Sequence, residues 1–303
     1  MERDDFIIHV YLLVCDLYHE FLKRHCPQGS LRSGGFAPAL SDEEVITIEI
    51  CGEHFKLHTD QDLYDYFACH YLHFFPCLPD RVAFVRQAAN LWQVKAWIQH
   101  RLVQRSGADR DPLQVIDTLP VPVCGLARAS RDRCFVGEAD RGYCAAKKMS
   151  YHGFKLGLRI ARSGMIVHYP LLAARSNDVK HLPTLVEECS NLIATDKGFW
   201  DPWGQALIED RQGVIVVVPK RKNMKQPAPH PPNVQRTCSY WRKRIETVGS
   251  QLTEHFALAR IRVRNLWHLQ HRLIRKVLAH TVAVFLNLQL GRPPLDLDDL
   301  VTH

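Results

Sequence analysis

The segment Leu113-Gln-Val-Ile-Asp-Thr-Leu119 places one carboxylate, that of Asp117, inside a largely apolar run with β-branched residues. Such a run is typical of a buried strand. Burying an unpaired carboxylate costs on the order of several kcal/mol, so this aspartate needs a compensating charge. A bound cation would supply that charge, and a salt bridge or a position at a sheet edge are the alternatives. The segment therefore predicts a strand that carries part of a functional site.

Short strand-like runs alternate with helical stretches after this segment, which predicts a mixed α/β region over residues 111–303. Strands are expected at residues 113–123, 154–161, 165–173, 192–195 and 214–218. Helices are expected at residues 178–190, 201–210, 239–256 and 266–290, and residues 260–264 are expected to form a short strand or an extended segment.

Residues 1–110 have helical apolar spacing instead, which predicts a separate all-helical N-terminal domain. Helices are expected at residues 5–25, 60–77 and 80–104, and a capping box of Ser41 and Glu44 begins another. The helix at 80–104 is basic and could read DNA, or it could be a packing or dimerisation helix with one solvated face. Its basic residues are Arg81, Arg86, Lys95, Arg101 and Arg105.

The composition excludes several classes of protein. The chain of 303 residues is 46% hydrophobic and 23% charged, which is ordinary for a globular protein of about two domains. The apolar N-terminal segment has no basic leader, and no run of about 18 uncharged apolar residues occurs, so a core helix and no membrane span are expected. The ten cysteines form no CxxC motif, which favours a reducing, cytoplasmic compartment. The spacing of Cys69, His73 and Cys77 lacks a fourth metal ligand, and buried thiols with a helix-face histidine are the alternative.

Positive charge is concentrated in one part of the chain. The net charge is +7, yet residues 1–110 hold 11 basic and 15 acidic residues. Residues 219–276 hold 14 basic residues against only Glu246 and Glu254. A concentrated basic stretch attracts polyanions, because each neutralised phosphate releases a counterion. Nucleic-acid binding is therefore expected, and a solvated surface is the alternative.

Two further acids join Asp117 as candidates for chemistry. Asp196 ends the strand-like run that begins at Leu192, and the carboxyl ends of strands are where α/β sheets place ligands. Glu246 lies on a helix rich in cations. Oxygen ligands from separate elements suit Mg²⁺ or Mn²⁺, and two such ions can act on a phosphodiester.

Each of these acids also has a plainer interpretation. Asp-Lys-Gly at residues 196–198 is a common turn, and Glu246 could pair with Arg242 at i−4. Glu138, Asp140 and Asp178 are competing acids, but their segments look like loops.

Longer runs around these acids resemble those of bacterial insertion-sequence transposases of the DDE type, most closely insertion-sequence family 982. The similarity covers about residues 40–290 in the order of the family. The runs are Leu40–Ile48, Asp117–Cys124, Gly142–Leu156, Asp196–Phe199, Pro219–Lys225, Arg244–Leu252, Leu278–Thr281 and Phe285–Asn287.

The resemblance implies an RNase H-like catalytic domain over residues 111–303, with a mixed five-stranded sheet flanked by helices and basic C-terminal helices. The helical domain at 1–110 would precede it, with a possible role in binding DNA ends. Asp117, Asp196 and Glu246 would be the catalytic triad that binds two Mg²⁺ or Mn²⁺ ions. The implied chemistry is water attack at the ends of the element, followed by attack of the freed 3′-hydroxyl on target DNA.

The implied partner is double-stranded DNA, both the terminal inverted repeats and the target, bound by a homodimer in the bacterial cytoplasm at the nucleoid. In-line displacement requires charge neutralisation around the phosphate. Candidate DNA-binding residues are Lys147, Lys148, Lys197, Lys220, Arg221, Lys222, Lys225, Arg242 and Lys243. Solvated surface is the alternative for each lysine.

Two positions depart from the family pattern. Position 253, seven residues after Glu246, is threonine where related transposases usually carry lysine or arginine, and position 249 is glycine where an aromatic residue is typical. A degenerate DNA-binding protein of the same fold, and a nuclease that cuts without joining, are therefore the alternative functions.

Overall fold

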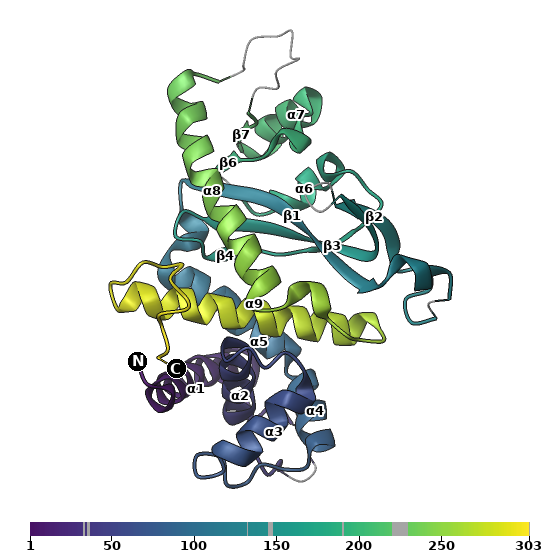
Figure 1. The fold of residues 1–303 in the computed structure, drawn as a ribbon. Helices are drawn as coiled ribbons and strands as arrows, with labels where there is room; N and C mark the ends of the chain where they lie inside the picture. Colours follow the sequence, from purple (N-terminus) through teal and green to yellow (C-terminus); the bar gives the residue numbers. More distant parts are fainter. Residues whose placement is uncertain are drawn as a thin grey trace. The chain divides into compact units, whose positions relative to one another are not determined.

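The computed structural model describes residues 1–32, 34, 37–131, 133–144, 148–189, 191–219 and 230–302 (Figure 1). The chain divides into two compact units. Unit 1 comprises Met1–Arg105, Glu254–Leu258 and Trp267–His303, and unit 2 comprises Ser106–Thr253 and Ala259–Leu266. The C-terminal residues from Trp267 onward thus cluster with the N-terminal helices, whereas the sequence pattern places them with the second domain. Within the described residues, no helix combines the length and apolar character that a membrane span needs.

Unit 1 is built from helices in its described part. They are α1 (Arg3–His25), α2 (Asp42–His54), α3 (Asp60–His70), α4 (Arg81–Asn90), α5 (Trp92–Ser106) and α9 (Leu266–Gln289).

The predicted capping box at the start of α2 is confirmed. The Glu44 amide donates to Ser41 Oγ at 3.2 Å, and the Ser41 amide donates to Glu44 Oε2 at 2.7 Å. The single helix expected at 80–104 is wrong, because the chain turns at the buried Leu91 and forms α4 and α5. The helix expected at 60–77 ends at His70, where the following aromatic residues pack in turns.

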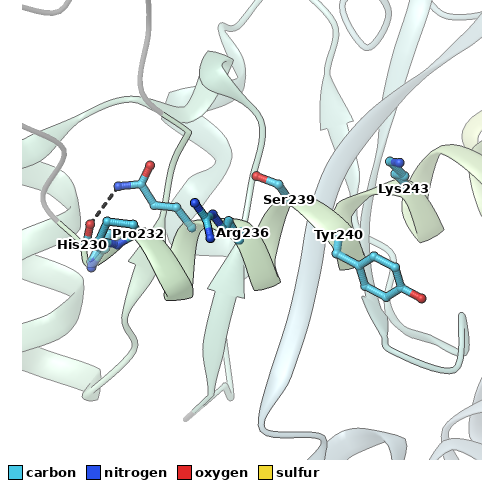
Figure 2. A pocket seen from close by; sticks show the side chains of 7 residues that line it. His230, Pro232, Arg236, Ser239, Tyr240 and Lys243 are labelled. Atoms are coloured by element: carbon cyan, nitrogen blue, oxygen red, sulfur yellow. Dashed lines mark hydrogen bonds between the residues drawn. The ribbon is translucent and has the colours of Figure 1, made fainter.

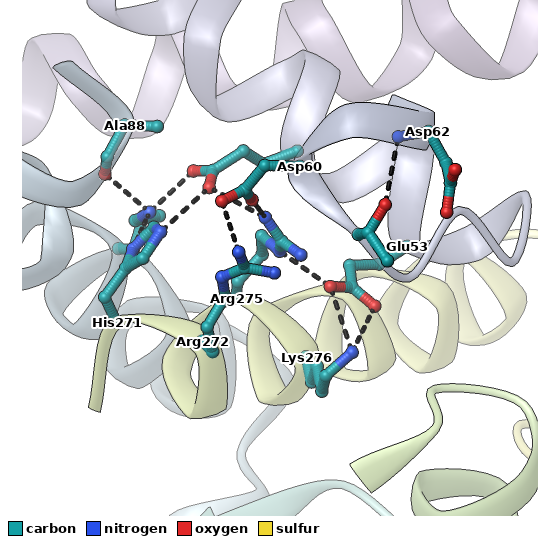
Figure 3. Close-up of polar contacts among 11 residues, drawn as sticks. Glu53, Asp60, Asp62, Ala88, His271, Arg272, Arg275 and Lys276 are labelled. Carbon is teal, nitrogen blue, oxygen red and sulfur yellow. Dashed lines mark hydrogen bonds and ion pairs between the residues drawn. The ribbon is translucent and has the colours of Figure 1, made fainter. Parts of the chain in front are cut away.

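Buried ion pairs connect four helices of unit 1. Arg275 of α9 donates from Nε to Glu53 Oε1 at 2.6 Å, and Lys276 Nζ lies 2.8 Å from Glu53 Oε2 (Figure 3). Arg275 Nη1 reaches Asp60 of α3 at 2.9 Å, and Lys95 Nζ of α5 reaches Glu49 of α2 at 2.5 Å. The polar residues at the centre of this unit are therefore paired with one another.

Unit 2 is organised around a mixed sheet. Its strands are β1 (Leu113–Cys124), β2 (Asp140–Cys144), β3 (Met149–Ala161), β4 (Ile166–His168), β5 (Leu171–Ala173), β6 (Leu192–Ala194) and β7 (Val216–Val217). The order along the sheet is β2-β3-β1-β6-β7, and β4 and β5 each pair with β3. Strand β1 pairs antiparallel with β3 and parallel with β6, and β6 pairs parallel with β7.

The sheet therefore has seven strands in the described residues, of which five lie on the main path. Asp140, expected in a loop, begins the additional strand β2, which takes its register from β3. The run at 165–173 splits into the short strands β4 and β5. Residues 261–264 form no strand among the described residues.

Helices cover both faces of this sheet. The remaining helices of unit 2 are α6 (Leu182–Leu185), α7 (Pro202–Gln212) and α8 (Pro232–Glu254). Ile116 of β1 joins a buried apolar cluster with residues of α6 and α7, among them Leu185 and Ile208. Since side chains alternate along a strand, Asp117 and Leu119 face the opposite side, where α8 lies (Figure 1).

Gly249 brings α8 close to β1. A Cβ at this position would lie 3.1 Å from Leu119 Cδ2, which is tighter than an ordinary van der Waals contact. A larger side chain at this position would require Leu119 to shift. Glycine at position 249 therefore allows this close packing, although it costs about 1 kcal/mol of helix propensity.

Candidate active site

The register of β1 and β6 sets two aspartates side by side. Val115 pairs with Ala194 in the parallel ladder. Two residues further along each segment come Asp117, in the middle of β1, and Asp196, just after the end of β6. Both therefore continue from the last paired residues of the two strands. Residues at equivalent positions of adjacent strands lie about 5 Å apart. The sheet therefore brings together two acids that are distant in the sequence.

Backbone amides hold both carboxylates. The Thr118 amide donates to Asp117 Oδ1 at 2.8 Å, and the Gly198 amide donates to Asp196 Oδ1 at 2.6 Å. A Cβ on Gly198 would lie 2.8 Å from that same Asp196 oxygen, so a larger residue would displace the carboxylate. The Asp-Lys-Gly segment is thus a turn, as the plainer interpretation held, and this turn fixes the orientation of Asp196.

Burial and like charge act together on Asp117. The pKa of its carboxyl is raised from 3.8 to about 7, chiefly by desolvation and in addition by the nearby charges of Asp196 and Asp178. The Thr118 amide and the Arg242 guanidinium oppose this rise. The ion pairs among the described residues include none for Asp117 or Asp196. Two adjacent carboxylates with too little positive charge around them are suited to bind a divalent cation. Such a cation would supply the missing positive charge and lower the pKa of Asp117.

Glu246 lies on α8 in a more open position. Its side chain is 59% exposed, and its Oε1 lies 3.2 Å from Nη2 of Arg242. The i−4 pairing considered from the sequence is therefore present. Arg242 also lies close enough to Asp117 to lower its pKa. The guanidinium thus interacts with both the helix acid and the strand acid.

Asp178 is part of this site, although the sequence pattern ranks it below the other acids. Its Oδ1 accepts from Thr118 Oγ1 at 2.9 Å and from Lys155 Nζ at 2.9 Å. Lys155 also donates to the Ser176 carbonyl at 2.8 Å. Thr118 therefore connects Asp178 to Asp117, since its hydroxyl binds one acid and its amide binds the other.

A polar cleft of about 740 Å³ lies beside these residues. Lys155, Asp178 and Gly198 line it together with Arg141, Tyr143 and Arg175. The Lys155–Asp178 pair and the Asp196 turn therefore border the same cleft as several cationic and aromatic side chains. Such side chains are suited to bind a sugar–phosphate chain.

A second hollow of about 780 Å³ follows one face of α8 (Figure 2). Arg236, Ser239, Tyr240 and Lys243 line it, and Lys243 is exposed. A face that presents two cations and an exposed tyrosine is again suited to a polyanion.

The other predicted DNA-binding residues fall into two groups. Lys148 and Lys197 are exposed. The remainder lie outside the described residues: Lys147, Lys220, Arg221, Lys222 and Lys225. Thr253, the second departure from the family, donates its hydroxyl to the Gly249 carbonyl at 2.8 Å.

In the described residues, no three His, Cys, Asp or Glu side chains converge closely enough to hold one metal ion. This includes Cys69 and Cys77, which are both exposed, so the buried-thiol alternative for them is wrong. The Asp117–Asp196 pair is thus a two-carboxylate site, with Glu246 on the neighbouring helix.

A comparison with known protein families gives a match over the region that contains Asp117, Asp196 and Glu246. The family described as transposase DDE domain matches residues 107–266, which is more than half of the chain. Searches of curated proteins and of solved structures give no match. The matched span includes β1, β6 with the Asp196 turn that follows it, and all of α8. The chain therefore belongs to the transposase DDE domain family of insertion-sequence and mobile-element proteins, which act in DNA transposition.

Proposed function

We propose that this transposase uses Asp117, Asp196 and Glu246 as its acidic triad on an RNase H-like domain, and that it is most similar to insertion-sequence family 982. The observation that carries the proposal is the parallel register of β1 and β6, which ends at the pair Val115 and Ala194 and so brings Asp117 of β1 near Asp196, two residues after β6. The third acid would come from α8, which packs on the same face through Gly249.

The residues present fit Mg²⁺ or Mn²⁺. Asp117, Asp196 and Glu246 would hold two such ions, which activate an attacking oxygen and stabilise the leaving oxygen of a phosphodiester. The raised pKa of Asp117 supports this assignment, because the burial of this carboxyl and the neighbouring acids outweigh the effect of Arg242. To join the two aspartates, the Glu246 side chain would have to leave Arg242 and turn toward them.

The chain's own residues would position the DNA strand. The exposed Arg141 and Arg175 line the cleft beside the Asp196 turn and can bind phosphate oxygens, while the Thr118 and Gly198 amides keep the two carboxylates fixed. The proposed reaction is hydrolysis at the ends of the element and then transfer of the new 3′-hydroxyl to target DNA. Because two ends must be held together, we propose that a homodimer performs it.

Asp196→Asn is the decisive variant, and Asp210→Asn, on the exposed surface of α7, is the matched control. A plasmid that carries the element is incubated with Mn²⁺ and a target plasmid, and cleaved and joined products are measured separately. We expect Asp196→Asn to lower the yields of cleaved and of joined products by about a hundredfold or more, because several kcal/mol of transition-state stabilisation is lost. Asp210→Asn should match the wild type.

The outcomes separate the alternative functions. Equal products from Asp196→Asn and wild type would contradict the triad. Cleavage without joining by the wild type would indicate a nuclease, and DNA binding without either product would indicate a degenerate copy.

A further inference from the structure

A small hollow on unit 1 has the features of a second nucleic-acid site. It measures about 300 Å³ and lies between α4 and the first turn of α9. Arg81 and Arg86 of α4 line it on one side, and Trp267 and His268 of α9 line it on the other. The Trp267 side chain is 38% exposed, and its ring contacts that of His268 at a centroid distance of 4.8 Å.

These two arginines differ from the other cations of the same chain segment. Lys95 is buried against Glu49 at 2.5 Å, Arg101 pairs with Glu20 at 2.8 Å, and Arg105 pairs with Asp16 at 2.5 Å. Arg81 and Arg86 are both exposed, and no ion pair joins either of them to another described residue. Of the five basic residues that suggested a DNA-reading helix, these two are therefore the ones that can bind an external anion.

The acids near the hollow are already engaged. Asp60 lines it but pairs with Arg272 and, at 2.9 Å, with Arg275. Asp80 precedes α4 and caps its first turn, accepting from the Val82 amide at 2.9 Å and the Ala83 amide at 3.1 Å. The helix amides are thus occupied as well, so an anion bound here would be held by the arginine side chains.

We propose that this α4–α9 hollow binds the sugar–phosphate backbone of duplex DNA, with Arg81 and Arg86 on phosphate oxygens and Trp267 packed against the adjoining deoxyribose. Planar guanidinium groups match phosphate geometry, and an exposed aromatic ring beside them supplies the apolar contact that a free inorganic anion does not need. The proposal extends the proposed function, and it depends on that function only for the statement that the substrate is DNA. It gives unit 1 a direct role in holding that DNA.

The test measures binding of the full chain to a labelled, mixed-sequence DNA duplex by fluorescence anisotropy over a range of salt concentrations, in EDTA so that no cleavage occurs. The variant is Arg81→Ala with Arg86→Ala. We expect affinity to fall about tenfold at moderate salt, and the slope of log K against log salt to decrease by about two, one for each lost phosphate contact.

The matched control is Lys23→Ala with Arg24→Ala, which removes the same charge from exposed positions of α1 in the same unit. It should leave the slope nearly unchanged. Trp267→Ala should weaken binding severalfold and Trp267→Phe should restore it. Thermal unfolding checks that each variant is folded.

Equal salt slopes for the Arg81 and Arg86 double variant, its control and the wild type would overturn the proposal. Binding to labelled heparin is measured in the same way. If the double variant loses heparin binding and duplex binding equally, the hollow is a general anion site and the proposal is wrong. These outcomes are independent of the triad, because Asp196→Asn tests cleavage and this experiment measures only binding.

Discussion

Units 1 and 2 differ in how the negative charge of their buried acidic side chains is compensated. In unit 1, Glu53 is fully buried, and cations of the same unit lie within 2.6 to 2.8 Å of its oxygens. These cations hold the pKa of Glu53 below its usual range despite the cost of desolvation. In unit 2, Asp117 and Asp196 lie side by side with little compensation, and the pKa of Asp117 rises to about 7.

The difference agrees with the proposed roles, a structural one for the acids of unit 1 and a functional one for Asp117 and Asp196. Unit 1 neutralises its acids within the fold, so removing either partner leaves an uncompensated buried charge. Unit 2 keeps two carboxylates in a costly arrangement that would be relieved by a charge from solution. Stability is sacrificed in this way where activity requires it. The same type of substitution should therefore have opposite effects on stability in the two units.

The largest effect is expected for Glu53→Gln. It leaves Arg275 and Lys276 buried without their shared carboxylate, so the free energy of unfolding should fall by about 3–5 kcal/mol. Urea unfolding measures it, and hydrogen exchange localises the loss to unit 1. The control Asp298→Asn breaks an exposed pair with Lys56 in the same unit and should cost less than about 1 kcal/mol. A similar loss in both variants would mean that the buried pairs of Glu53 stabilise unit 1 no more than an exposed pair does.

A smaller effect of opposite sign is expected for Asp117→Asn. In metal-free buffer it relieves desolvation and the repulsion from Asp196, so unfolding free energy should rise by about 1–2 kcal/mol while cleavage is lost. Urea unfolding in EDTA is the measurement, with Asp210→Asn as the control. A destabilised Asp117→Asn protein would mean that Asp117 is compensated within the fold.

The smallest effect, taken per pH unit, concerns the pH dependence of stability. His280 of α9 is fully buried, and desolvation lowers its pKa from 6.5 to about 3. Between these values the unfolded chain binds a proton that the folded chain does not, so stability falls as pH decreases from about 6.5 to about 3. The slope for one proton is at most about 1.4 kcal/mol per pH unit.

His280→Gln should reduce this slope by one proton. Unfolding free energies measured at several pH values in this window would show it, with the exposed His9→Gln as the control. Unchanged pH dependence in His280→Gln would mean that this histidine is protonated in the folded state.

Much of the local structure followed from the sequence. The run around Asp117 indicated β1, the spacing of Ser41 and Glu44 indicated the capping box, and the acidic residues in apolar or basic surroundings were identifiable as candidates. Strand β2 was missed, because a five-residue strand held by its register with β3 has too little apolar pattern of its own. The contribution of Asp178 was missed because its partners, Thr118 and Lys155, are remote in the chain.

By itself the sequence determined the strand that carries Asp117, the concentration of positive charge and the family resemblance, because these depend on residue type and short-range spacing. Only the tertiary structure decided that Asp117 stands beside Asp196 and that Lys95 is internal whereas Arg81 and Arg86 are exposed. The physical reason is that the charge available at a site depends on which distant side chains neutralise one another. Spacing along the chain does not specify those partners, whereas strand register and helix packing do.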